Sequence, residues 1–322
     1  MKLLTSIMLA ASLAIAPDTG SAQAYPTKPV RLICPYAPGG STDIISRAIA
    51  HELGKTLGQP VYVENRTGAG ANVGAEMAAR SAPDGYTIFM SASSLHGITP
   101  ALYTKLNYDP NKDLVPVIAL VAHRYVLVVN QSMNAHSVKD IIQLAKAQPG
   151  KLTFASAGSG STVHMSGEMF KQLAGVDIVH IPYKGSGPAA VDLLGGQVDM
   201  MFGDMPGMLP HIRSGKLRAL GVTGAKREAA LPEVPTIAES GVPGMESAVW
   251  FGIAVPVGTP KEIIARLNAA AAQGITSPEF VKRMNEQGFD IVGGTPEQMA
   301  EMIKVEVQRW APVVKASGAK AN

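Results

Sequence analysis

The chain has 322 residues, a net charge of +3 and a single cysteine, Cys34. This length is enough for one large domain or two ordinary ones, and the lack of a long basic run argues against a nucleic-acid partner. One cysteine excludes an intrachain disulfide, so the core must be stabilised by apolar burial. Cys34 lies in an apolar run and is interpreted as a small buried apolar residue.

Residues 1–24 have the pattern of a secretory signal peptide. Lys2 supplies an early positive charge, residues 3–16 are mostly apolar, and Ala22 and Ala24 fit a small-x-small cleavage pattern. The apolar run is short for a transmembrane helix, although an uncleaved membrane anchor is the alternative. We predict cleavage after Ala24 and a periplasmic mature protein.

The first third of the mature chain alternates apolar runs with helical patterns. Residues 30–34 predict a buried strand, residues 35–43 (PYAPGGSTD) a turn, and the apolar spacing from residue 44 to 53 a helix. Two further predicted strands, 61–63 and 86–90, also lead into loops rich in glycine or serine. This alternation predicts a mostly parallel, doubly wound α/β sheet.

Residues 115–129 differ because they are rich in β-forming residues and carry no helix signal. They predict one long strand that passes from a first lobe to a second. Strand, loop and helix units then recur, followed by a Pro- and Gly-rich connection over 224–247 and a β-rich return crossing over 248–255. The chain beyond residue 259 is predicted to be helical, with Thr259 as N-cap and Pro260 as the first helical residue. We expect two doubly wound lobes joined by two crossings, with lobe 1 formed by residues 25–122 and 248–322 and lobe 2 by residues 123–247.

All the glycine- or serine-rich loops follow predicted strands, and ligands bind at that edge of open α/β sheets. The composition of the loops favours a small carboxylate or polar solute held by hydroxyls, helix N-termini and bridging waters. Arg66 and Lys184 are their only cations. Asp43 fits helix capping and ligand contact equally well, and a structural hydrogen bond is an alternative role for Asp204.

A secreted hydrolase or isomerase that uses Ser161, His164 and Asp204 is the alternative function. Ser161 and His164 are three residues apart and could meet on one helical turn. The interpretation that we favour is that Ser161 caps a helix and that His164 lines the cleft or the core, because no nucleophile elbow or oxyanion hole is recognisable. His164 and Glu168 alone do not define a metal site, so no metal and no cofactor are expected.

Several motifs, in this order along the mature chain, resemble the Bug family, the substrate-binding receptors of tripartite tricarboxylate transporters. The motifs are YP and PVR near the mature N-terminus, PYAPGGSTD, NRTGAG, PDGYT, SAGSGS, PYKG and VPT. The resemblance implies a type II periplasmic-binding-protein fold, the Venus flytrap, that performs no chemistry. It also implies that the partners are membrane components of a tripartite transporter, with a sensor kinase as an alternative, and that the receptor is a monomer.

The resemblance also implies which residues bind the ligand. A ligand carboxylate would be held from lobe 1 by Ala37, Gly40, Ser41 and Thr42, and from lobe 2 by Gly158, Ser161, Tyr183 and Gly185, while Asp204 would read the distal part of the ligand. Leu95 replaces a hydroxyl residue of the family pattern, which puts the usual polar contact there in doubt. The full expected ligand-binding set is Tyr36, Ala37, Gly40, Ser41, Thr42, Asp43, Ala69, Ser91, His96, Gly158, Ser161, His164, Tyr183, Gly185 and Asp204.

Overall fold

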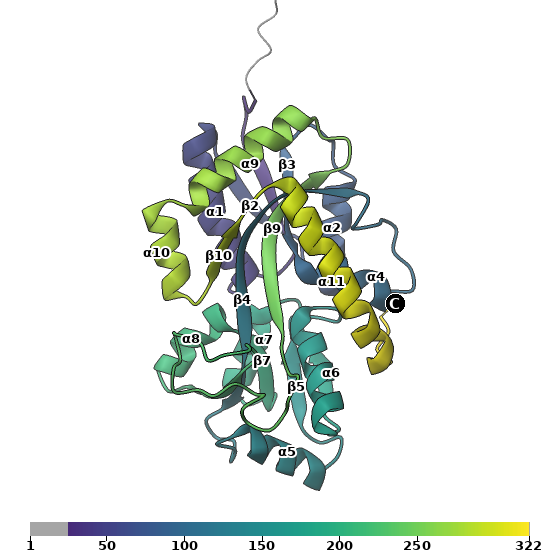
Figure 1. The fold of residues 1–322 in the computed structure, drawn as a ribbon, viewed down its shortest axis with the longest axis vertical. Helices are drawn as coiled ribbons and strands as arrows, with labels where there is room; N and C mark the ends of the chain where they lie inside the picture. Colours follow the sequence, from purple (N-terminus) through teal and green to yellow (C-terminus); the bar gives the residue numbers. More distant parts are fainter. Residues whose placement is uncertain (1–24, 322) are drawn as a thin grey trace, which may run out of the picture.

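The computed structural model describes residues 25–321, so the predicted signal peptide lies outside the described part of the chain. The described residues form two α/β lobes along one ten-stranded sheet (Figure 1), which confirms the expected fold class. Three parallel strands form the outer part of the first lobe: β1 (Val30–Cys34), β2 (Val61–Asn65) and β3 (Thr87–Ala92). Its helical elements are α1 (Ser41–Leu57), η1 (Ala69–Ala71), α2 (Asn72–Ala79), α3 (Ser93–Gly97), α4 (Thr99–Leu102), α9 (Lys261–Ile275), α10 (Pro278–Glu286) and α11 (Pro296–Ser317).

The second lobe repeats the strand-loop-helix arrangement around β5 (Thr153–Ser156). This strand lies between β6 (Val179–Pro182) and β7 (Met200–Asp204) and is parallel to both. Each of these strands leads into a helix that begins within a few residues, as the sequence predicts. The helices of this lobe are α5 (Val138–Ala147), α6 (Thr162–Ala174), α7 (Ser186–Leu194) and α8 (Met205–Arg213).

One strand of 17 residues, β4 (Leu114–Asn130), runs through both lobes (Figure 1), which confirms the predicted long crossing strand. As far as Arg124 it pairs with β9 (Ala248–Pro256), the return crossing. From Tyr125 onward it lies between β7 and β8 (Leu217–Val222). The strand therefore changes partners between Arg124 and Tyr125, and the covalent connection between the lobes is continuous with both sheets.

The C-terminal region contains a strand that the sequence analysis did not predict. β10 (Asp290–Gly293) lies between α10 and α11 in the chain and pairs antiparallel with β4. The expectation that the chain beyond residue 259 contains only helices is therefore wrong. The strand has only four residues and is partly exposed, so it has little apolar periodicity to reveal it. The predicted capping by Thr259 is also wrong, because its hydroxyl donates to Pro256 O at 2.7 Å and α9 begins one residue later than expected, after Pro260.

An apolar cluster joins the two lobes beside the crossing strands. Trp310 of α11 is fully buried against Met165 of α6, with Ile98, Leu102 and Val314 around them. The Trp310 indole N–H donates to the Glu306 carboxylate at 2.7 Å, so its polar atom has a partner inside the cluster. Since α6 belongs to the second lobe and α11 to the first, this packing stabilises an arrangement in which the lobes are closed on each other.

Candidate ligand-binding site

A cavity lies between the lobes, where the carboxyl ends of the parallel strands meet the crossing strands. In this arrangement of the lobes it is narrow, with a cavity volume of about 20 Å³. Loops after β1, β3, β5 and β6 contribute to its wall, as do the end of β7 and both crossing strands. The lining residues are Tyr36, Gly40, Ser41, Thr42, Ala92, Ser94, Tyr125, Ala157, Ser161, Thr162, Val163, Ser186, Asp204, Val249 and Phe251.

Three helices begin at this cavity. The N-caps of α1, α6 and α7 are Gly40, Ser161 and Gly185, and residues of the first turn of each helix line the wall. The first N–H groups of a helix have no acceptor within the helix, and the helix dipole places partial positive charge there. Hydroxyl groups of Ser41, Thr42 and Ser186 lie in the same wall. The cavity is therefore suited to an anion without containing a lysine or an arginine.

A second cavity adjoins the first and shares Tyr36 and Ala157 with it. Its wall includes the loop at Gly68–Ala71 and the loops after β5 and β6, with Lys184 and Lys320 at the edge. The two lobes approach closely here, since a Cβ on Gly70 would lie 2.0 Å from Ser159 O. A glycine is required at this position both by that approach and by its φ of +61°.

The structure brings most of the expected ligand-binding residues to these two cavities. The first is lined by Tyr36, Gly40, Ser41, Thr42, Ser161 and Asp204. The second is lined by Tyr36, Ala69, Gly158 and Tyr183. Ala37 and Gly185 meet at the contact between the lobes, where a Cβ on Gly185 would lie 3.0 Å from Ala37 N. Whether each of these residues contacts a ligand remains a prediction.

Asp43 does not line either cavity. Its carboxylate accepts hydrogen bonds from Gly39 N, Arg47 and Asn65, at 3.0 to 3.3 Å. Burial opposes ionisation of Asp43, but these donors outweigh it and lower the pKa of the carboxyl. Through these hydrogen bonds Asp43 stabilises the loop before α1 on the side away from the cavity.

Ser91 and His96 also lie behind the cavity wall, inside the first lobe. Ser91 Oγ is 2.8 Å from His96 Nε2, and His96 Nδ1 is 2.8 Å from Asn111 Oδ1. Burial lowers the pKa of His96 to about 4, so the ring is neutral at pH 7. Leu95 points into the core, and the neighbouring Ser94 brings a hydroxyl to the cavity.

His164 packs behind the loop that carries Ser161. Its ring stacks on His180 with centroids 3.9 Å apart, and its Nδ1 accepts a hydrogen bond from Gly160 N at 3.2 Å. Burial, together with the proximity of His180 and Lys171, lowers the pKa of His164 to about 3. The Ser161 hydroxyl donates to Gly158 O at 2.7 Å and accepts from His164 N at 3.2 Å, as an N-cap does.

This arrangement does not form the triad that an acyl-transfer enzyme would need. The Ser161 hydroxyl proton is directed to a backbone carbonyl, and the His164 ring accepts a hydrogen bond from the backbone. Asp204 faces a different histidine, His123, with Oδ1 4.0 Å from Nε2. Ser161 therefore caps the helix, as the favoured interpretation predicts, and His164 lies in the core, one of the two places expected for it.

Sequence reasoning missed Tyr125, Phe251 and His123, which the crossing strands bring to the cavity or directly behind it. Tyr125 and Phe251 line the cavity, and His123 is fully buried and stacks on Phe251 with centroids 5.6 Å apart. The register of β4 against β9 sets these positions, and the two strands are more than a hundred residues apart in sequence. A local pattern carries no signal for such a pairing.

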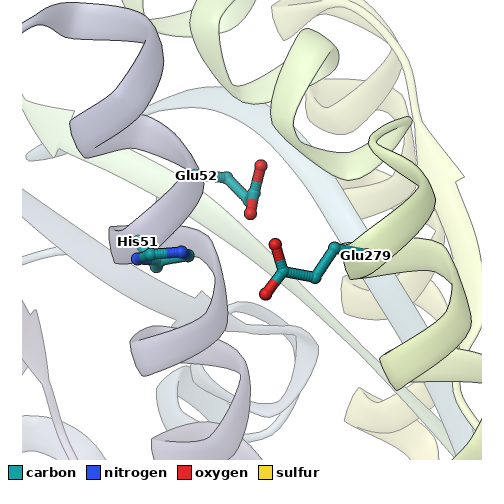
Figure 2. Close-up of side chains that lie close together, drawn as sticks. All are labelled: His51, Glu52 and Glu279. Atoms are coloured by element: carbon teal, nitrogen blue, oxygen red, sulfur yellow. The ribbon is translucent and has the colours of Figure 1, made fainter.

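His51, Glu52 and Glu279 form the one cluster among residues 25–321 whose geometry could suit a metal ion (Figure 2). The two carboxylates face each other between α1 and α10 (Figure 2), but Lys55 Nζ lies 2.9 Å from Glu52 Oε1 and 3.0 Å from Glu279 Oε2. The lysine ammonium thus already balances the charge that a cation would neutralise. The cluster joins α1 to α10, about 15 Å along α1 from the cavity at 1.5 Å per residue.

Comparison with known proteins agrees with this fold and cavity. A family model described as "Tripartite tricarboxylate transporter family receptor" matches residues 45–319. BugT of Bordetella pertussis is 43% identical over 301 residues, which cover 93% of this chain and 92% of that protein. The structure of R. palustris Rpa4515 with adipate is 38% identical with a TM-score of 0.89 and covers 92% of this chain and 99% of its own. MatC from Rhodopseudomonas palustris with bound malate is 34% identical with a TM-score of 0.87, and the match covers 90% of this chain and 100% of the MatC chain.

The two-lobed α/β fold and its similarity to periplasmic binding protein BugD, which is 35% identical with a TM-score of 0.89 over 92% of this chain and 100% of that one, place the chain among the periplasmic solute-binding proteins. Within this class, the chain belongs to the receptor family of the tripartite tricarboxylate transporters, in which the Bug proteins are its relatives. This confirms the resemblance read from the sequence motifs. Between residues 25 and 321, no helix combines the length and the apolar character needed to cross a bilayer.

Proposed function

We propose that this receptor binds one small carboxylate in the cavity between its lobes. The convergence of three helix N-termini on a mostly buried cavity is the observation that carries this proposal. A carboxylate there would accept hydrogen bonds from backbone N–H groups and from the hydroxyls of Ser41, Thr42 and Ser186. Adipate and malate in the two R. palustris structures support the same ligand class.

The proposed mechanism is capture by lobe closure and delivery to the membrane components of a tripartite transporter. Lobe 1 is proposed to comprise residues 25–122 and 248–322, and lobe 2 residues 123–247, with the hinge near the change of partners in β4. The closed arrangement buries the cavity, which excludes water and strengthens the hydrogen bonds to the ligand. We further propose that the chain is exported, cleaved after Ala24 and active as a monomer without catalysing a reaction.

A thermal-shift screen of the mature, ligand-free protein against small carboxylic acids and their amides tests the binding proposal. A ligand at a hundred times its dissociation constant stabilises the fold by about 2.7 kcal/mol. The proposal predicts stabilisation by at least one acid and none by the corresponding amide, because only the acid offers the anion to the helix N-termini. Stabilisation by amides alone would contradict it.

A further inference from the structure

Asp204 places a buried carboxylate in the wall of a cavity that otherwise suits an anion. The residue is 4% exposed and lies at the end of β7, where it lines the cavity. Within residues 25–321, His123 is the one group that forms an ion-pair contact with this carboxylate, at 4.0 Å, and no lysine or arginine lines the cavity. A buried carboxylate without a close cationic partner is costly, so the site favours an occupant that supplies a hydrogen-bond donor.

His123 lies directly behind Asp204 and reinforces this requirement. Its Nδ1 is 2.8 Å from Arg124 O, a carbonyl that can only accept, so the Nδ1 atom carries the ring proton. The Nε2 atom of the neutral ring is then an acceptor, has no hydrogen-bond partner, and lies 4.0 Å from Asp204 Oδ1. Two acceptors thus lie 4.0 Å apart with no proton between them, so the ring does not donate to the Asp204 carboxylate from behind.

The charged groups around His123 do not supply this donor. Arg124 follows it on the same strand, but its guanidinium is paired with Asp290 of β10 and with Glu228. The other faces of the ring are covered by Tyr125, Phe251 and Phe289. Burial lowers the pKa of His123, while Asp204 acts in the opposite direction.

We propose that Asp204, with His123 behind it, selects ligands that carry a hydrogen-bond donor, an ammonium or a hydroxyl group, in addition to a carboxylate. The ligand class would be amino acids and hydroxy acids rather than unsubstituted dicarboxylates. This inference rests on the proposed function, since the carboxylate of the same ligand would lie at the helix N-termini. A second carboxylate placed at Asp204 would be repelled, because both groups are anionic and no cation of the first cavity wall separates them.

The test is calorimetric titration of the mature protein with two matched series of acids. The first comprises succinate, malate and aspartate, and the second adipate, 2-hydroxyadipate and 2-aminoadipate. Within a series, only the donor group changes. The proposal predicts that a hydroxy or amino acid binds at least about tenfold more tightly than the plain diacid of the same length, as expected for a hydrogen bond to a charged group. Equal or tighter binding of both plain diacids would overturn it.

Two variants test whether Asp204 and His123 cause the preference for donor-bearing acids. Asp204→Asn should weaken the donor-bearing acid and leave the plain diacid unchanged or tighter, whereas Asp140→Asn, a matched change on α5 outside the cavity, should preserve the preference. His123→Phe should weaken binding of the donor-bearing acid alone. A merely structural defect would weaken binding of the plain diacid as well. A preference that survives Asp204→Asn overturns the proposed role of Asp204. Acids that bind without any donor preference overturn this inference but leave the proposed function intact, while failure of every acid to bind overturns the proposed function itself.

Discussion

Ala37 donates its backbone N–H to the backbone oxygen of Lys184 at 3.1 Å, and this hydrogen bond joins the two lobes at the edge of the cavity. Ala37 belongs to the turn after β1 and Lys184 to the loop after β6. This hydrogen bond requires the two lobes to be close together, so the loops after β1 and β6 are in contact in this structure.

Gly187→Ala should impair closure without straining the lobe that contains it. Gly187 is in the first turn of α7, and a Cβ there would lie 2.4 Å from Pro38 O of the other lobe. We expect ligand affinity to fall about fivefold or more, because overpacking costs about 1–3 kcal/mol. Calorimetric titration measures the loss of ligand affinity, and thermal unfolding checks that the stability of the ligand-free protein is unchanged. Gly207→Ala is the control, because a Cβ there meets no atom within 4 Å. Equal ligand affinities of the two variants would show that the contact between Gly187 and Pro38 is not needed for binding.

Tyr103→Phe should accelerate ligand release. The Tyr103 hydroxyl donates to Ser159 O at 3.1 Å, a second hydrogen bond between the lobes. Its loss should weaken binding about two- to tenfold, in line with about 0.5–1.5 kcal/mol for one hydrogen bond, and mainly through the off-rate. Stopped-flow measurement of the off-rate checks this, with Tyr62→Phe on the exposed face of β2 as the control. An off-rate that matches that of the control would show that this bond does not hold the lobes together.

Ser161→Ala distinguishes a receptor from an enzyme. Ser161 caps α6 at the cavity, and Ser137 caps α5 through the same kind of bond to the third helical residue. Each substitution should cost about 0.5–2 kcal/mol of unfolding free energy, but only Ser161→Ala should also weaken ligand binding. Urea unfolding and titration of both variants measure this. A decisive loss of turnover in Ser161→Ala, in an assay where the unmodified protein converts its ligand, would favour the enzyme alternative.

The stacked pair of His164 and His180 should make the fold less stable in mild acid. Burial, aided by the nearby Lys171, lowers the pKa of His180 to about 4, and that of His164 is about 3. Between these values and the ordinary value of about 6.5, the unfolded chain binds protons that the folded chain does not. Stability should therefore be fully present above about pH 6.5 and fall as the pH decreases, by up to about 1.4 kcal/mol per pH unit for each histidine.

Urea unfolding between pH 7.5 and 5.5 measures this dependence before most carboxylates titrate. His180→Gln should reduce the slope, because it removes one of the buried rings, whereas His51→Gln, at an exposed position, should preserve it. Equal unfolding free energies of the unmodified protein at the two ends of this range would show that the neutral pair does not contribute in this way.

The sequence predicts features that depend on neighbours in the chain. A serine that follows a glycine-rich loop and precedes a helical pattern predicts a helix cap, and Ser161 caps α6. Asp204 was selected because it directly follows a buried strand, and such a position places it at the ligand edge of the sheet. The long crossing strand β4 is recognisable because its sequence is rich in β-forming residues and carries no helix periodicity.

Features that depend on pairing between distant strands were not predictable in this way. His123 and Phe251 stack because β4 and β9 are aligned in one register, and a shift of one residue would turn both side chains to the other face. The sequence alone does not separate the two roles of Asp43, because capping residues and ligand contacts share the same residue types. Its partners Arg47 and Asn65 decide its position, and Asn65 belongs to a different strand.

The most direct test of the account is a calorimetric titration of the mature protein with its best-binding acid, followed by recovery and mass analysis of that acid. The account predicts one binding site per chain, loss of binding when the carboxylate is replaced by an amide, and recovery of the acid chemically unchanged. Binding of the amide with the same affinity, or recovery of the acid in a converted form, would contradict the conclusion that this protein is a receptor for a small carboxylate.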